Sequence, residues 1–297
     1  MGVLFMIRIG QAGIPLSCKG RTNKDGLVYT HDTLDFNAME IQIVRGLYVI
    51  PDEELLFIKE YAEENDMQLI IHAPYYLNLA GDDEEKEMSI DKVVKSCIIA
   101  SKINASYVVV HPGFYGDQSP EETSAKISSA IKEIQQILKN EDAVVSLALE
   151  TMGKKKVFGS LEEIVDVCTK LENVYPAIDV GHIHSRTNGG LKTYEDFEAI
   201  FEQLSSLNLD HFLIHVTGVL YEDGNEFYHV PIKKGDMPVM PLIELILDKR
   251  LNVTLISESP LLEHDAGYLR LQVERAIMKR TGKEEADYRD LSELYAD

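Results

Sequence analysis

Residues 107–150 read YVVVHPGFYGDQSPEETSAKISSAIKEIQQILKNEDAVVSLALE and contain the unit that decides the fold. The uninterrupted apolar run 107–110 is typical of a strand buried on both faces of a parallel sheet. Ser119-Pro120-Glu121-Glu122 predicts a helix start, because it combines a capping serine, a first-turn proline and a glutamate three residues after the cap. A second apolar run, 144–150, follows. The stretch therefore predicts two parallel strands joined by a helix in a right-handed crossover.

The same alternation extends along the whole chain. Eight short apolar runs alternate with amphipathic stretches, at residues 4–10, 38–44, 68–72, 107–111, 144–150, 174–179, 212–215 and 253–258. Residues 160–163 repeat the capping box, and 193–196 give a looser version of it. Eight strand–helix repeats predict an α/β protein with a single (β/α)8 TIM barrel. An open doubly wound sheet is the alternative, but no glycine-rich fingerprint follows the first run to support it.

The length and charge of the chain limit its possible domain organisation and its possible partners. The 297 residues suit one barrel, and no linker or shift in composition divides them. We therefore expect one domain over 1–297, with the charged segment 281–297 as a peripheral helical tail. Twenty-nine basic and 50 acidic residues leave a formal net charge of −21. This excess argues against a partner held by the global field alone, so nucleic acid requires a local basic patch.

The cysteines and the apolar segments indicate the compartment. Cys18, Cys97 and Cys168 are widely spaced and odd in number, so they predict no disulfide framework and fit a reducing cytoplasm. The N-terminal apolar run is too short for a signal peptide, and no stretch approaches the roughly 18 apolar residues of a membrane span. We expect a cytoplasmic protein without a membrane partner.

Residues that commonly bind metals follow six of the apolar runs. They are His72, His111, Glu150, Asp179, His215 and Glu258. In a barrel the carboxyl ends of all strands lie on one face, where catalytic groups are found. One such residue is as easily an ordinary loop or capping residue, but six in succession favour a site. His182 and His229 extend the set, whereas His184 is a weaker candidate and His211 precedes its strand at the opposite end of the barrel.

The ligand types constrain the metal. Imidazole with carboxylate suits zinc, manganese or iron, and no organic cofactor is indicated. The ligands are too many for one tetrahedral ion. Glu150, in the middle of the order, is the expected bridge between two ions at roughly 3.5–4 Å, the spacing of two-metal phosphoester chemistry.

Six local phrases resemble those of a known family. They are IHAPYYLN at 71–78, VHPG at 110–113, LET at 149–151, IDVGHIH at 178–184, IH at 214–215 and SE at 257–258. In order and approximate spacing they resemble endonuclease IV, the metal-dependent apurinic/apyrimidinic (AP) endonuclease family in the xylose isomerase-like TIM barrel superfamily. The first two phrases are the most specific. The segments 10–13 and 150–156 depart from the family's usual phrases, which fits a divergent member, of archaeal type.

The resemblance implies a centre of three zinc ions. The first ion would bind His72, His111 and Glu150, and the second would bind Glu150, Asp179, His215 and Glu258. The third would bind His182, His229 and an aspartate two residues before the later histidine, where this chain has Phe227. Glu226, Asp223 or a water are alternatives for that ligand, or the centre holds two ions.

The implied activity is that of a zinc-dependent phosphodiesterase, a hydrolase that cuts duplex DNA 5′ to an abasic site in base-excision repair. Catalysis would involve Glu150 and Glu258, with Glu258 orienting or deprotonating the attacking water. DNA contacts are expected from cations and aromatic rings in strand-to-helix loops. The candidates are Arg45, Tyr75, Tyr76, Lys154, Lys155 and Arg186.

Two other functions remain open. A metal-dependent sugar isomerase or epimerase of the same superfamily needs one ion, which Glu150, Asp179, His215 and Glu258 could hold alone. His72 and His111 favour a multinuclear centre instead. The third possibility is a binding protein without catalysis, which Phe227 favours.

Overall fold

Eight parallel strands form the barrel in the computed structural model, which describes residues 5–43, 50–291 and 294. The strands are β1 (Ile7–Gln11), β2 (Ala38–Gln42), β3 (Gln68–His72), β4 (Tyr107–Val110), β5 (Ser146–Glu150), β6 (Val174–Asp179), β7 (Phe212–Val216) and β10 (Val253–Ser257). Their order is β1-β10-β7-β6-β5-β4-β3-β2. A parallel bridge between Ala12 and Glu40 brings β1 beside β2 and closes the ring. The predicted TIM barrel is confirmed.

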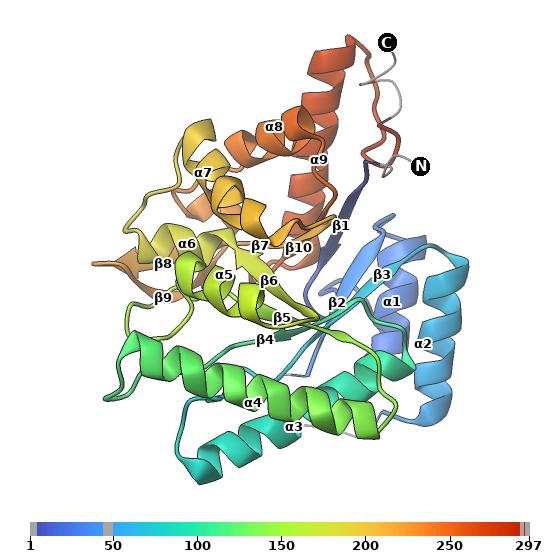
Figure 1. The fold of residues 1–297 in the computed structure, drawn as a ribbon. Helices are drawn as coiled ribbons and strands as arrows, with labels where there is room; N and C mark the ends of the chain where they lie inside the picture. The colour runs from blue at the N-terminus through green and yellow to red at the C-terminus, as the bar shows by residue number, and fades with distance from the viewer. Residues whose placement is uncertain (1–4, 44–49, 292–293, 295–297) are drawn as a thin grey trace.

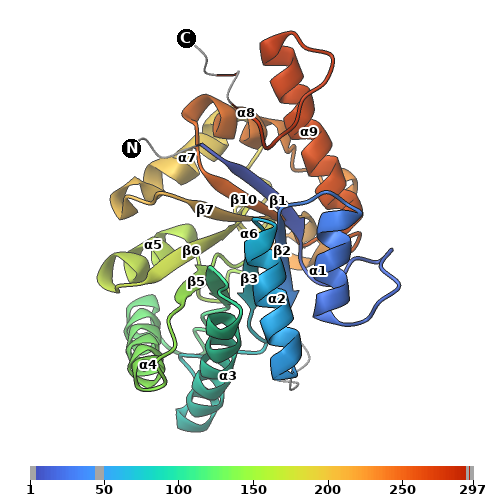
Figure 2. The same ribbon diagram turned by 90° about the vertical axis from the view of Figure 1, so that its right-hand side faces the viewer.

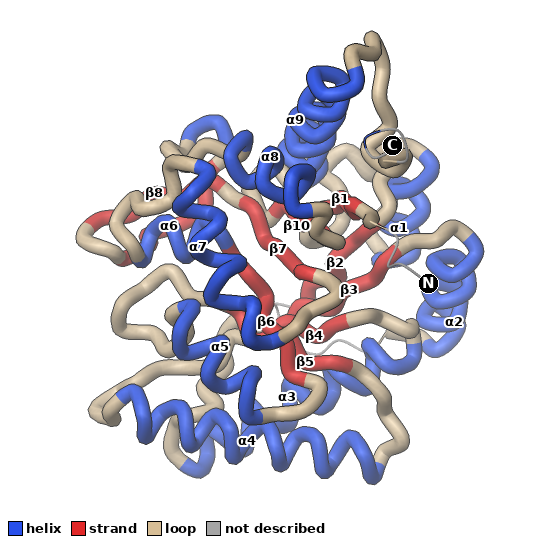
Figure 3. The backbone as a smooth tube through the Cα atoms, turned by 45° about the horizontal axis from the view of Figure 1, so that its top comes forward, coloured by secondary structure: helices blue, strands red, loops and turns tan. Residues whose placement is uncertain are grey.

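Helices surround the strands on the outside (Figures 1, 2 and 3). They are α1 (Asn23–Asp32), α2 (Asp52–Glu64), α3 (Asp83–Lys102), α4 (Pro120–Asn140), α5 (Leu161–Lys170), α6 (Val180–Arg186), α7 (Tyr194–Leu204), α8 (Met240–Lys249) and α9 (Glu263–Thr281). The capping boxes predicted at Ser119, Ser160 and Thr193 are confirmed. None of the described helices is both long and apolar enough to cross a membrane.

One layer of small and branched side chains fills the inside of the barrel. It consists of Ala12, Ala38, Ile70, Val109, Ala148, Ala177, Leu213 and Ile256. Larger apolar side chains on the outward faces of the strands pack against the helices. Successive side chains of a strand alternate between the two faces, so the residue two positions beyond each interior residue points toward the barrel axis again. This register positions the candidate site.

A two-stranded antiparallel hairpin is inserted between β7 and α8. Its strands are β8 (Gly218–Glu222) and β9 (Asn225–Val230). The hairpin projects from the barrel at the left of Figure 1. The eight apolar runs do not predict this hairpin.

The C-terminal segment differs from the expected helical tail. Gly282, with φ of 71°, ends α9, and the described residues that follow up to Leu291 are not helical. Tyr288 is buried, and its hydroxyl donates to Asn37 Oδ1 at 3.0 Å. Arg289 forms an ion pair with Asp35 at 2.7 Å. The expectation of a peripheral helix is wrong here, because an aromatic anchor within the charged segment attaches it to the barrel.

Candidate metal centre

The interior register accounts for all six residues predicted at the strand ends. Each lies two positions beyond an interior residue, in the pairs Ile70–His72, Val109–His111, Ala148–Glu150, Ala177–Asp179, Leu213–His215 and Ile256–Glu258. Their side chains therefore turn toward the axis at the carboxyl end of the barrel. Glu40 follows Ala38 in the same way, and strand-end reasoning misses it because apolar Ile41 and Ile43 continue the run beyond it.

Glu150 lies at the centre of the cluster and is completely buried. Its Oε2 is 2.7 Å from His111 Nε2 and 3.3 Å from His72 Nε2. Its Oε1 is 3.4 Å from His182 Nδ1 and 3.5 Å from His215 Nδ1. One carboxylate thus faces four imidazoles with both of its oxygens, as a bridging ligand must.

Several buried polar atoms of the cluster have no hydrogen-bond partner among the described residues. They are Glu150 Oε1, Asp179 Oδ2, Glu258 Oε1, His215 Nδ1 and His215 Nε2, together with both carboxylate oxygens of Glu40. Buried polar groups are normally hydrogen-bonded, and buried charges are paired or coordinate metals. The donor set of carboxylate oxygens and imidazole nitrogens therefore fits divalent ions such as zinc.

Backbone carbonyls fix the orientation of three imidazoles. The Nδ1–H groups of His72, His182 and His229 donate to the carbonyls of Ala73, Thr151 and Glu258, at 2.7, 2.8 and 3.1 Å. A carbonyl only accepts, so a neutral ring leaves its Nε2 lone pair facing the centre. This is the orientation that outer hydrogen bonds impose on metal-binding histidines.

His182 of α6 meets His229 and Glu226 of β9 next to the main cluster. The Nε2 atoms of His182 and His229 are 3.2 Å apart. The Glu226 carboxylate lies 3.3 Å from Nε2 of His182 and 3.4 Å from Nε2 of His229. Burial acts to raise the pKa of Glu226, but the two histidines outweigh it and lower the pKa to about 2. Phe227, by contrast, is 58% exposed. Glu226 thus occupies the place for which Phe227 offers no ligand.

Crowded carboxylates dominate the electrostatics of the main cluster. Burial raises the pKa of Glu258 to about 7, and the nearby Glu150 and Glu40 act in the same direction. Burial by itself lowers the pKa of His72, but these three carboxylates together outweigh it and raise the pKa to about 9. Both pKa shifts arise because several carboxylates lie close together in a buried space. A bound cation would offset the repulsion between their negative charges.

Ligand-type atoms lie within 4.8 Å of one another in four groups of residues. The groups are His72–His111–Glu150, Glu150–Asp179–His215–Glu258, Asp179–His182–His229 and Glu40–His72–Glu258. The groups His72–His111–Glu150 and Glu150–Asp179–His215–Glu258 contain the residues that the resemblance assigns to the first two ions. The group Asp179–His182–His229 contains the two histidines assigned to the third ion, with Asp179 as its carboxylate. That these residues bind metal stays a proposal, developed below.

A pocket of about 660 Å³ opens onto the cluster. Tyr75, Tyr76 and Lys154, predicted to contact DNA, line it. Phe227 and Tyr228 of the hairpin add two exposed rings to its wall. Of the other predicted contacts, Lys155 does not line this pocket, and Arg45 lies outside the described residues.

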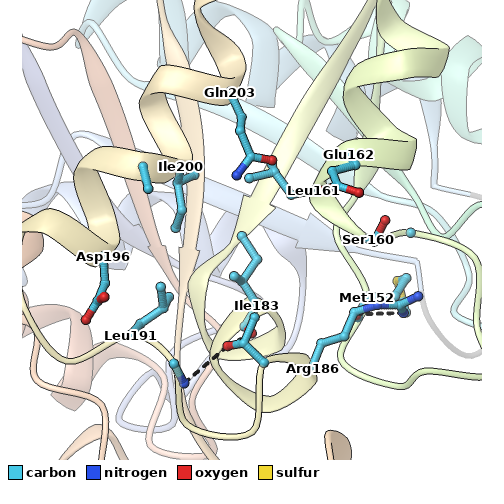
Figure 4. Close-up of a pocket in the computed structure, with 14 residues that line it drawn as sticks. Met152, Ser160, Leu161, Glu162, Ile183, Arg186, Leu191, Asp196, Ile200 and Gln203 are labelled. Atoms are coloured by element: carbon cyan, nitrogen blue, oxygen red, sulfur yellow. Dashed lines mark hydrogen bonds between the residues drawn. The ribbon is translucent and has the colours of Figure 1, made fainter.

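Arg186 is tied to the protein itself. Its guanidinium donates to the carbonyls of Lys154 and Val157 at 2.6 and 2.8 Å, and more weakly to that of Met152 at 3.4 Å. Figure 4 shows it beside Met152, in a second pocket of about 400 Å³ lined by residues of α5, α6 and α7. The contact of Arg186 with DNA stays a prediction, but these bonds favour a role in bracing the loop that carries Lys154.

Replacing Arg186 with alanine is expected to lower the free energy of unfolding by about 2–3 kcal/mol, because the loop carbonyls lose a charged, largely buried donor. Denaturant unfolding measures this change. Lys156→Ala, which removes an exposed cation from the same loop, serves as the control and should leave stability nearly unchanged. Equal stability of the two variants would contradict the bracing role.

The remaining histidines lie outside the cluster. His184 Nε2 pairs with Asp236 Oδ1 at 3.0 Å. His211 Nε2 lies 2.9 Å from the Thr254 hydroxyl at the amino-terminal end of the barrel, as expected for a structural residue.

The protein is a TIM barrel. Histidines and carboxylates gather at the carboxyl ends of its strands and form a candidate multinuclear metal centre. The chain belongs to the xylose isomerase-like TIM barrel family, whose model matches residues 32–274.

Individual relatives extend this assignment. An uncharacterised protein of Methanocaldococcus jannaschii is 32% identical over 88% of this chain and 95% of its own length. A probable endonuclease 4 of Mycoplasmopsis synoviae is 31% identical over 67% of this chain and 72% of its own length. The solved structure of a D-tagatose 3-epimerase-like protein shares the fold, with a TM-score of 0.66, 19% identity, and coverage of 89% of this chain and 96% of its own. The fold therefore does not separate nuclease from epimerase.

Proposed function

We propose that the protein is a metal-dependent phosphodiesterase, an AP endonuclease that cuts duplex DNA 5′ to an abasic site. The observation that carries this proposal is that His72 and His111 both lie next to Glu150. Glu150 also belongs to a second group of possible ligands, with Asp179, His215 and Glu258. A single ion does not require both groups, whereas a multinuclear centre does. The similarity to a probable endonuclease 4 supports the same reading.

Zinc is the proposed metal, with two or three ions per chain and manganese or iron as alternatives, because imidazole–carboxylate sites accept each of these. His72, His111 and Glu150 would hold the first ion, and Asp179, His215 and Glu258 would join Glu150 around the second. His182, His229 and Glu226 would hold the third. Glu226 then supplies the carboxylate that Phe227 does not.

Ions held by these residues would supply Lewis-acid polarisation of the phosphodiester and would make water a competent nucleophile near neutral pH. The residues of the chain would position the reacting groups and keep bulk water out of the centre. Glu258 lines the pocket with a side chain that is only 5% exposed, and its carboxylate can orient the attacking water and accept its proton. Glu150 holds the imidazoles of the main cluster in one arrangement through both of its oxygens.

The wall of the pocket provides groups suited to nucleic acid. Tyr75 and Tyr76 follow His72 closely in the chain and can stack against bases that flank an abasic site. Lys154 and Lys155 place two cations on the loop after β5, where they can face phosphates despite the acidic total charge. Arg45, which follows β2 in the sequence and lies outside the described residues, is proposed as a further contact.

Cleavage of a duplex with one synthetic abasic site tests the activity, with zinc measured in the same preparation. We expect incision at that single position, abolished by a chelator, and two or three ions per chain. Glu258→Gln should lose most of this activity, on the order of 10²–10³-fold, because a neutral amide cannot accept the proton of water. An unchanged circular dichroism spectrum shows that the variant is folded, and near-wild-type cleavage by it would overturn the role of Glu258.

A sugar isomerase or epimerase is the second candidate. The group Glu150–Asp179–His215–Glu258 is sufficient for one ion, and the net charge of −21 suits a small substrate better than DNA. One ion per chain, no incision of abasic DNA and turnover of a ketose would favour it. Full metal occupancy without turnover of either substrate would favour a binding protein.

A further inference from the structure

Glu40 is a buried carboxylate in the metal centre to which neither the apolar runs nor the resemblance assigns a function. It lies on β2, two positions beyond the interior residue Ala38, and its side chain is completely buried. Its Oε2 is 2.9 Å from His215 Nε2. The contact is an ion-pair distance, since neither oxygen of Glu40 and neither ring nitrogen of His215 has a hydrogen-bond partner in the described part of the chain.

His215 lies between Glu40 and the other carboxylates of the centre. Its Nδ1 is 3.5 Å from Glu150 Oε1 and 3.5 Å from Glu258 Oε1, on the side of the ring opposite Glu40. A neutral imidazole carries one N–H, and an ionised carboxylate only accepts. The Glu40 carboxylate, 2.9 Å from Nε2, therefore favours the tautomer that carries its hydrogen on Nε2. The Nδ1 lone pair is then directed toward the space between Glu150 and Glu258.

The other imidazoles with a defined orientation differ from His215 in their partner. His72, His182 and His229 each donate to a neutral backbone carbonyl. Hydrogen bonds to an ionised acceptor are stronger than hydrogen bonds to a neutral one. A carboxylate partner also makes a metal-binding imidazole a stronger donor to the ion.

We propose that Glu40 is a positioning residue for the metal centre: it fixes the tautomer and orientation of His215 and thereby strengthens binding of the ion shared with Glu150, Asp179 and Glu258. The proposal rests on the metal centre of the proposed function, but not on its substrate. It also explains why the Glu40 carboxylate is buried close to other carboxylates of the centre, an arrangement that costs stability unless a cation compensates for it.

The test is the metal affinity of Glu40→Gln, which keeps the size of the side chain and removes its charge. Competition with a chromophoric zinc chelator should show one ion bound 10- to 100-fold more weakly, the usual effect of losing an outer-shell partner. The other ions should bind as in the wild type. In the cobalt-substituted protein, the visible absorption of one ion should change, which a purely structural effect on the barrel would not produce.

Asp236→Asn is the matched control, because it breaks the same kind of carboxylate–imidazole pair, with His184, outside the centre. It should leave zinc affinity and the cobalt spectrum unchanged. Glu40→Asp, which retains the charge on a shorter side chain, should lie between Glu40→Gln and the wild type. Thermal unfolding of the metal-free variants verifies that each is folded.

The outcomes separate this proposal from the one on which it rests. Wild-type affinity and spectrum in Glu40→Gln would overturn the positioning role and leave the metal centre intact. Complete loss of one ion at saturating zinc would also overturn it, because Glu40 would then be a direct ligand, as its proximity to His72 and Glu258 allows. A wild-type protein that binds no ion would overturn the metal centre itself.

Discussion

Replacing Glu150 with glutamine is expected to remove at least one metal ion per chain and to lower kcat/KM for abasic DNA by about 10³-fold or more. The carboxylate faces His72 and His111 with one oxygen and His182 and His215 with the other. An amide offers one neutral oxygen and directs an NH2 group at the remaining imidazoles. The loss should reach at least the upper end of what a single preorganised contact contributes.

Metal analysis and single-turnover cleavage measure both effects of Glu150→Gln. Glu172→Gln, which makes the same change on an exposed side chain beyond α5, is the control and should retain full metal and activity. If Glu150→Gln kept all its ions, Glu150 would not be the bridging ligand. If it lost an ion but kept its cleavage rate, the second group would not take part in the chemistry.

Removing the metal should lower the melting temperature of the wild-type protein by roughly 5 °C for each ion. A ligand that binds only the folded state at about 100 times its Kd stabilises that state by about 2.7 kcal/mol. For a chain of this size each kcal/mol corresponds to roughly 2 °C. The carboxylates Glu40, Glu150, Asp179 and Glu258, whose side chains are almost wholly buried, explain the direction of the effect, since without a cation they are left close together.

Calorimetry before and after dialysis against a chelator measures the change, and readdition of zinc should restore both the melting temperature and the incision activity. Magnesium at the same concentration is the matched control, because it prefers oxygen ligands to imidazole. A melting temperature that responds to neither chelator nor zinc would show that the cluster is stable without a metal.

Much of the fold could be predicted because the information is local. Apolar runs such as 107–111 show where strands are buried on both faces, and capping residues such as Ser119 and Ser160 show where helices begin. A strand end in a barrel also has a known face, so His72, Glu150 and Asp179 could be placed together before any contact was known. The atoms that each of these residues faces could not be predicted, because a distance such as that from Glu150 to His111 depends on the pairing of separate strands.

The parts missed by sequence reasoning share one physical cause. Glu40 lies inside an apolar run, and its role depends on His215, which reaches it only when the barrel closes. Glu226 belongs to a hairpin whose antiparallel pairing sets it beside His182, in the helix that follows β6. Tyr288 anchors a segment whose charge alone predicts a peripheral position.

By itself, the amino-acid sequence determined the eight strand–helix units, their direction and the face on which the polar strand ends gather. It could do so because alternation along a strand and caps at a helix are properties of neighbouring residues. Only the tertiary structure decided which atoms face one another. It placed Glu150 among four imidazoles, turned the guanidinium of Arg186 toward the carbonyls of its own loop and set Glu40 against His215. Those contacts join residues far apart in the chain, and their geometry is set by the closure and packing of the whole barrel.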